Sequence, residues 1–397
     1  MKITSVDLLA LEQDRGNGSR PIICRINTVS GLFGYGEAGI AIGTGAPACF
    51  ALLKDFAPMI IGMDANYNEV IWEKIFKASF WGVGNGGVIM SALSAIDCAI
   101  WDLKAKAANV PLYKLLGGKQ RDKLWSYASQ LQFGWATDSF NPAQAASGDP
   151  AFYSEAAKKA LAQGFTAVKA NFIRYDRQGK ILPPAATTGR LSRELMKLAE
   201  QRIAAVRDAV GSDVEIIAEN HAMTDAATAI QFAGMAEQFD IMFLEEGAIP
   251  LNPGVMKKIA EKTGIPLATG ERTYTRWGFL PFLENHCLTV IQPDIGNCGG
   301  ITEGKKICDM AHIYDVGVQT HVCSSPINLA VSLHLEAAIP NFTIHEHHIG
   351  STLPSCVEMG KYDYQPRDGY FEIPELPGIG QEVSEKALKS AHIETIG

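Results

Sequence analysis

Titratable side chains recur at regular intervals through the second half of the sequence, each directly after a short apolar segment. From Glu219 onward, neighbouring members are 23 to 27 residues apart. One strand and one helix of a (β/α)8 barrel take on the order of 25–30 residues, and the barrel brings all strand ends to one rim, where its active sites form. The spacing therefore predicts one such group at each strand end, namely Lys169, Glu219, Glu245, Glu271, Asp294, His321 and Glu346.

Three consecutive members of this series, Glu219, Glu245 and Glu271, are carboxylates. Ionised carboxylates do not share a partly dry pocket without a cation. An all-oxygen set suits a hard, octahedral ion, so we expect a Mg²⁺ site. A single acid after a strand is usually a helix cap, but capping does not explain a series in phase with the barrel repeat. Zinc is disfavoured because no cysteine or histidine pair on these strands has ligand spacing.

Two histidines are candidates for proton transfer. Asp294 and His321 are expected on adjacent strands, where the acid can fix one imidazole nitrogen and leave the other free to take a proton. His221 follows Glu219 by two residues, so in an extended strand end it shares that residue's face. It is a candidate acid on the other flank of the ion, although a purely binding role is equally open.

The remaining strand-end groups have less certain partners. Lys169 ends the second strand alone, because Asn171 stands where a second lysine would give a pair of facing bases. The run His345-Glu346-His347-His348 resembles a metal tract, but consecutive strand residues alternate direction and cannot all bind one ion. We expect Glu346 to face the pocket.

Two patterns of secondary structure position these groups. Strand-like segments at 3–10, 22–29 and 34–38 come before helical periodicity at 48–62 and 87–108, which predicts an α+β domain over residues 1–120. From about residue 121 to 355, eight short apolar strands alternate with amphipathic helices, beginning at 125–132 and ending at 342–344. This alternation fits a (β/α)8 barrel better than a doubly wound sheet.

Two further segments lie outside this alternation. The tail at 356–397, with a strand at 369–373, is expected to fold back onto the first domain. A long polar insertion at 172–190 follows the second barrel strand, and loops of this length are usually functional or mobile.

Composition excludes several classes of protein. The 397 residues are 47% hydrophobic and 20% charged, with a net charge of −8 and no extended basic run, which argues against nucleic-acid binding. The eight cysteines form no CxxC pair, which argues against a zinc ribbon or a disulfide framework. No apolar stretch approaches the ~20 residues of a membrane span, and the first residues lack a signal-peptide core, so we expect a cytoplasmic location and no membrane partner.

Several motifs together resemble those of the enolase superfamily, in its mandelate racemase/muconate lactonizing group. They lie at 94–104, 111–118, 244–246, 270–272 and 292–301 and include Gly270-Glu271-Arg272 and Gln292-Pro293-Asp294. The resemblance implies an α+β capping domain on a modified (β/α)7β barrel, with Mg²⁺ holding a substrate carboxylate. It also implies abstraction of the proton α to that carboxylate, giving an enediolate intermediate, and a dimer or higher homo-oligomer.

Within that group, Glu219-Asn220-His221 resembles the acidic-x-His element of sugar-acid dehydratases such as gluconate, galactonate and mannonate dehydratases. The chain departs from the racemase pattern, which has Asp-x-Asn there and Lys-x-Lys on the second strand. Two further departures are the longer Glu219 in place of aspartate and Gly247 after the Glu-Glu pair.

The resulting expectation is dehydration of an aldonate-like sugar acid to its 2-keto-3-deoxy product. Mg²⁺ and Lys169 would polarise the carboxylate and Glu346 would hydrogen-bond it, while His321 would remove the C2 proton and His221 would protonate the leaving hydroxyl. The two histidines could exchange roles. Capping loops at 15–20 and 81–84 are expected to close over the distal hydroxyls. Two alternatives remain open: racemisation or epimerisation of a 2-hydroxy acid, and a catalytically weak sugar-acid-binding protein with a regulatory role.

Overall fold

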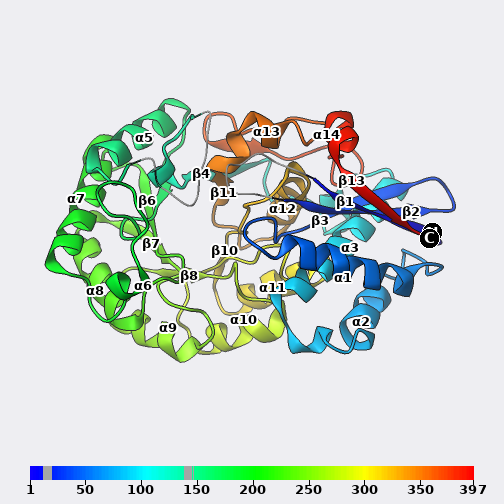
Figure 1. Ribbon diagram of the computed structural model, residues 1–397, viewed down its shortest axis with the longest axis horizontal. Helices are drawn as coiled ribbons and strands as arrows, with labels where there is room; N and C mark the ends of the chain where they lie inside the picture. Colours follow the sequence, from blue (N-terminus) through cyan, green and yellow to red (C-terminus); the bar gives the residue numbers. More distant parts are fainter. Residues whose placement is uncertain (12–19, 138–144, 146) are drawn as a thin grey trace.

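The computed structural model describes residues 1–11, 20–137, 145 and 147–397. A sheet with its own helices, built largely from the N-terminal residues, lies beside a larger unit in which helices surround parallel strands (Figure 1). Part of the expected capping loop at 15–20 lies outside the described residues. Among the described residues, no helix has the length and apolar character that crossing a bilayer requires.

The N-terminal unit is a four-stranded antiparallel sheet in the order β13-β1-β2-β3. Gly34 and Gly36 let one helix approach the sheet closely, because a Cβ at either position would collide with the backbone of that helix. The strands are β1 (Ile3–Ala10), β2 (Ile22–Thr28), β3 (Phe33–Ala38) and β13 (His392–Ile396), and the helices are α1 (Ala46–Ile60), α2 (Asn68–Ala78), η1 (Gly82–Gly84), α3 (Gly87–Ala107) and α4 (Leu112–Leu115).

The larger unit contains eight parallel strands in the order β10-β9-β8-β7-β6-β5-β4-β11. A parallel bridge between Val318 and Phe342 links the two ends of this order, so the sheet closes on itself. The strands are β4 (Lys123–Ser129), β5 (Ala167–Ala170), β6 (Glu215–Glu219), β7 (Ile241–Glu245), β8 (Leu267–Thr269), β9 (Val290–Ile291), β10 (Gly317–Val318) and β11 (His345–His348).

Helices follow the first seven of these strands and cover the outside of the sheet (Figure 1). Several begin at side-chain caps followed by proline, as at Asp149-Pro150 and Ser325-Pro326, where the missing N–H costs no hydrogen bond. The main helices are α5 (Pro150–Ala162), α7 (Arg193–Val210), α8 (Ala226–Ala236), α9 (Pro253–Ala260), α10 (Thr275–Glu284), α11 (Gly300–Ile313) and α12 (Pro326–Ala338), with short segments η2 (Leu131–Phe133), α6 (Pro184–Thr187) and η3 (Glu237–Phe239). The (β/α)7β barrel with an antiparallel cap is thus confirmed.

The last barrel strand and the tail differ from the sequence-based expectation. The predicted strand at 342–344 contributes only the closing bridge, and β11 begins at His345, where the chain first pairs with β4. The predicted strand at 369–373 is β12 (Tyr370–Glu372), but it pairs with β4 of the barrel rather than with the first domain. The tail reaches the N-terminal sheet through β13, which the sequence analysis did not predict, after η4 (Ile349–Thr352), α13 (Pro354–Val357) and α14 (Glu385–Ser390).

Two buried neutral histidines make stability dependent on pH. Burial lowers the pKa of His334 to about 4 and, with His345 and His348 nearby, the pKa of His347 to about 3. Both pKa values in the folded state lie below the unfolded value near 6.5. The free energy of unfolding is therefore unaffected by these rings above that pH and decreases as the pH falls below it. Each group should cost about 2 kcal/mol of unfolding free energy at pH 5.

Urea unfolding from pH 8 to 5 tests this expectation. His347→Gln should flatten the pH dependence by roughly 1 kcal/mol per pH unit below 6.5 relative to wild type. His312 is exposed, so His312→Gln should leave the slope unchanged. A His347→Gln slope equal to that of wild type would contradict the assignment of a buried neutral ring.

Candidate active site

Three carboxylates from neighbouring barrel strands converge at one rim. Glu219 and Glu245 end β6 and β7 and are direct partners in the parallel register, and Glu271 follows β8 by two residues. One oxygen from each carboxylate lies within 4.8 Å of the other two. Glu219 and Glu245 are buried, whereas Glu271 lines a cavity. These side chains therefore meet as the sequence spacing predicts.

The chemistry of this cluster fits a divalent cation. All three donors are carboxylate oxygens, which hard cations such as Mg²⁺ prefer. Burial raises the pKa of Glu245 to about 8, although Lys169 opposes the rise, and Glu219, Glu346 and Glu271 add like-charge repulsion. A bound cation would relieve that repulsion and keep the carboxylate ionised.

Lys169 connects the carboxylates beneath the cavity. Its Nζ lies 2.8 and 2.9 Å from the two oxygens of Glu245, 3.0 Å from Oε1 of Glu346 and 3.8 Å from Oε1 of Glu219. Burial alone would lower the pKa of Lys169, but these three carboxylates hold it well above its usual value. The lysine therefore places a positive charge among these carboxylates.

Replacing this charge should destabilise the protein when no metal is added. Lys169→Met leaves several buried carboxylates without their cation, and breaking a buried ion pair costs about 3–5 kcal/mol. The loss should shrink as pH falls, because protonation of the carboxylates then removes their repulsion. Urea midpoints in EDTA measure it. Lys158→Met, which removes an exposed lysine paired with Glu155, should change stability by less than about 1 kcal/mol. Equal small losses in both variants would contradict a structural charge at Lys169.

His321 and Asp294 form a hydrogen-bonded pair on the far side of the carboxylates. Nδ1 of His321 lies 2.8 Å from Oδ2 of Asp294, and Nε2 lies 3.4 Å from Oε2 of Glu271. Asp294 is buried, and its other oxygen accepts from the backbone N–H of Gly296 at 2.8 Å. This pairing directs Nε2 toward the cavity.

The charge around His321 controls its proton affinity. Burial disfavours the charged ring, but Glu271 and the hydrogen bond with Asp294 outweigh this effect and raise the pKa of His321 to about 10. Glu271 is the leading opposing group, so neutralising that carboxylate would lower the pKa toward the range that a general base needs.

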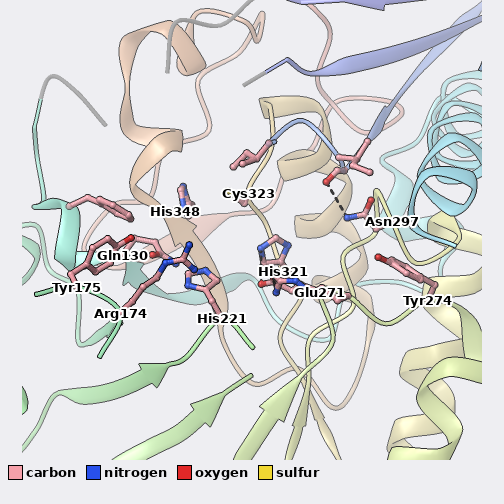
Figure 2. Close-up of a pocket in the computed structure, with 16 residues that line it drawn as sticks. Gln130, Arg174, Tyr175, His221, Glu271, Tyr274, Asn297, His321, Cys323 and His348 are labelled. Atoms are coloured by element: carbon pink, nitrogen blue, oxygen red, sulfur yellow. Dashed lines mark hydrogen bonds and ion pairs between the residues drawn. The ribbon is translucent and has the colours of Figure 1, made fainter. Parts of the chain in front are cut away.

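His221 reaches the cluster by a different route from the one expected. The strand ends at Glu219, and His221 and Ala222 both adopt left-handed backbone conformations, with φ of 49° and 54°. The extended strand end that the sequence analysis assumed is therefore wrong. The turn nevertheless brings Nε2 of His221 within 2.8 Å of Oε1 of Glu219. His221 and His321 both line the cavity, with His221 beside Arg174 and His321 beside Glu271 (Figure 2).

The histidine-rich strand β11 divides its residues between two faces. Oε1 of Glu346 accepts from Ser129 Oγ at 2.8 Å, and Oε2 accepts from the backbone N–H of Val322 at 3.1 Å. His348 lines the same cavity, whereas His345 and His347 contact Phe371 outside the barrel. The alternation expected of a strand thus holds here.

The cavity above the carboxylates has a volume of about 320 Å³, within the range of small-ligand sites. From the capping unit, the lining residues are Gly39, Ile40, Ile42 and Gly87, whereas the predicted loop at 81–84 does not contribute. Sequence reasoning gave no cavity role to several of the barrel residues that line it. Most of them lie in loops without periodic spacing, whereas His348 ends β11: Gln130, Arg174, Tyr175, Arg272, Asn297 and His348.

Three further residues near the cluster form hydrogen bonds or ion pairs with the surrounding groups. Gln130 donates through Nε2 to Oε2 of Glu219 at 2.7 Å. Arg272 pairs with both Glu271 and the buried Glu246. Asn171, which replaces the second lysine of the racemase pattern, instead accepts hydrogen bonds from the backbone of Ile173 and Arg174.

Comparison with known proteins places this architecture in a family. Residues 152–387 match the model described as "Enolase C-terminal domain-like", and residues 16–117 match the N-terminal domain of the mandelate racemase / muconate lactonizing enzyme family. The chain is 30% identical to D-galactonate dehydratase of Pectobacterium atrosepticum, covering 98% of this chain and 94% of the relative. It is 32% identical to D-galactonate dehydratase of Verminephrobacter eiseniae, covering 92% and 89%.

A solved structure described as a member of the enolase superfamily from Salmonella Typhimurium is 51% identical, with a TM-score of 0.95 and complete coverage of both chains. The family models cover both the cap and the barrel, and the relatives span nearly the whole chain. The chain therefore belongs to the enolase superfamily, in its mandelate racemase/muconate lactonizing group.

Proposed function

We propose that this protein catalyses the Mg²⁺-dependent dehydration of an aldonate-like sugar acid to a 2-keto-3-deoxy acid. The observation that carries the proposal is that two histidines line one cavity beside three clustered carboxylates, with His221 next to Glu219 and His321 next to Glu271. The D-galactonate dehydratases among its relatives support the same reaction class.

Each residue has a distinct task in this proposal. Glu219, Glu245 and Glu271 would hold Mg²⁺, which when bound would supply positive charge to stabilise the negative charge that develops at the substrate carboxylate as the C2 proton leaves. Lys169 keeps the carboxylate cluster compact, and Glu346 holds Lys169 in place through Oε1, which lies 3.0 Å from Nζ. Asp294 orients His321 so that Nε2 takes the proton from C2.

Loss of water completes the reaction. The electron pair released at C2 expels the C3 hydroxyl, to which His221 donates a proton, so that water leaves. The resulting enol gains a proton at C3 and becomes the 2-keto-3-deoxy acid. Atoms and charge balance without an oxidant or a second substrate.

A panel of five- and six-carbon sugar acids, incubated with Mg²⁺, tests the proposal. Formation of a semicarbazide-reactive 2-keto acid, dependent on Mg²⁺, is expected for at least one acid. Solvent deuterium at C2 of recovered substrate without loss of water would instead favour an epimerase, which a cavity lined by two histidines also permits. Tight binding without either reaction would favour a sugar-acid-binding role.

A further inference from the structure

The cavity contains a cation that the proposed chemistry does not use. Arg174 lies on the insertion that follows β5, and its half-buried side chain lines the cavity. Figure 2 shows it with Tyr175 and His221 on one side, whereas His321 and Glu271 lie on the other. Its guanidinium is therefore available to a ligand that also reaches the carboxylate cluster.

The backbone of the insertion holds Arg174 in place. Its N–H donates to Oδ1 of Asn171 at 2.9 Å, and its carbonyl accepts from Leu182 at 2.9 Å. The next residue, Tyr175, forms an antiparallel bridge with Ile181. These contacts fix the backbone on both sides of Arg174, so little backbone ordering is needed when a ligand binds.

The environment of Arg174 differs from that of the other cations near the cavity, each of which pairs with carboxylates. Arg272 pairs with Glu246 and Glu271, and Lys169 pairs with Glu245 and Glu346. Within the part of the chain that the structure describes, Arg174 forms no ion pair, and its buried Nε has no hydrogen-bond partner. A partly buried charge without a partner has a desolvation cost, which an ion pair with an anionic ligand would offset.

We infer that Arg174 binds a second anionic group of the substrate, at the end distant from the carboxylate that Mg²⁺ holds. This inference rests on the proposed function and narrows its substrate class. Arg174 pairs with none of the three clustered carboxylates in the described residues, and Figure 2 shows it across the cavity from Glu271. A substrate with a single carboxylate, bound at the cluster, therefore provides no anionic partner for the guanidinium.

The guanidinium fork donates hydrogen bonds to two oxygens of a carboxylate or a phosphate. The preferred substrates are thus sugar acids with an anion at each end: an aldaric acid, with a second carboxylate, or an aldonic acid phosphorylated at its terminal hydroxyl. An aldonic acid that ends in a neutral hydroxymethyl group lacks the partner for Arg174 and should be a poorer substrate.

Matched six-carbon acids that differ only at C6 test the inference. Wild-type kcat/KM should be at least about 30-fold higher for the hexaric acid or the 6-phosphohexonic acid than for the hexonic acid of the same configuration. The relative rates of the two dianions identify whether the anion is carboxylate or phosphate. Arg174→Met should lower kcat/KM for the preferred dianion about 100-fold and for the hexonic acid less than about 3-fold.

Arg177→Met provides the matched control, because Arg177 lies on the same insertion but pairs with Asp149 at the surface. It removes the same charge and should leave the preference intact. Calorimetric affinities for the same acids, measured in a His321→Asn background that blocks turnover, should show the same loss on adding Arg174→Met. An equal loss for dianions and hexonic acid would mean that Arg174 serves the shared end of the substrate, and would overturn the inference.

The inference and the proposed function fail in different ways. If hexonic acids are dehydrated as well as their dianionic counterparts, the Arg174 subsite is wrong and the dehydratase proposal stands. If no acid of any class loses water while the protein is folded and binds Mg²⁺, the dehydratase proposal itself is wrong.

Discussion

Glu245→Gln is expected to lower kcat/KM for dehydration by about 10³-fold, equivalent to about 4 kcal/mol of transition-state stabilisation. Glu245 lies beside Glu219 in the strand register and holds both hydrogen bonds to Lys169, so it is the most connected member of the triad. An amide keeps the shape of the side chain but contributes no negative charge to a divalent cation. Initial rates over a range of Mg²⁺ concentrations measure the effect.

The variant should also need much more Mg²⁺ for half-maximal activity. Glu261→Gln serves as the control, because it removes an exposed carboxylate at the end of α9 and should behave like wild type. Unchanged Mg²⁺ dependence in Glu245→Gln, together with near-normal turnover, would exclude this carboxylate from the metal site.

His321→Asn is expected to reduce kcat by about 10³-fold without weakening Mg²⁺ binding, because it removes a general base and leaves the three carboxylates intact. The substitution should also abolish exchange of the C2 proton with solvent deuterium. His221→Asn should block loss of water but allow that exchange, since His221 acts after the C2 proton has left. Rates of keto-acid formation and of deuterium incorporation, measured on the same samples, separate the two steps.

Asp294→Asn provides a graded comparison. It preserves the side-chain shape beside Nδ1 of His321 but removes the charge that favours the working orientation and tautomer of the ring. We expect a loss intermediate between wild type and His321→Asn. If exchange survives in His321→Asn and disappears in His221→Asn, the roles of the two histidines are the reverse of those proposed.

The barrel and the convergence of its strand-end groups could be predicted because both follow from short-range patterns. Short strands such as 167–170 and 267–269 are each followed by a helix, and the local sequence of each segment indicates its type. The regular alternation of strands and helices then shows which residues end the strands. The spacing places Glu219, Glu245 and Glu271 together in this way. No information about loop conformation is needed.

Features that depend on distant or irregular segments could not be predicted in the same way. The strand β13 pairs with β1 from the other end of the chain, and no local pattern in 392–396 indicates that partner. His221 reaches Glu219 through a left-handed turn rather than along a strand. Arg174 enters the cavity because the insertion doubles back at Tyr175 and Ile181, which its polar sequence does not reveal.

Crystallographic location of Mn²⁺, used as an anomalous scatterer in place of Mg²⁺, tests the convergence of the three carboxylates most directly. We predict one strong anomalous peak at the carboxyl ends of β6, β7 and β8, with oxygens of Glu219, Glu245 and Glu271 each about 2.0–2.3 Å from the ion. Glu245→Gln crystals should lose the peak at the same Mn²⁺ concentration. A fully occupied ion bound elsewhere, or no ion at millimolar Mn²⁺, would contradict the metal site and the chemistry built on it.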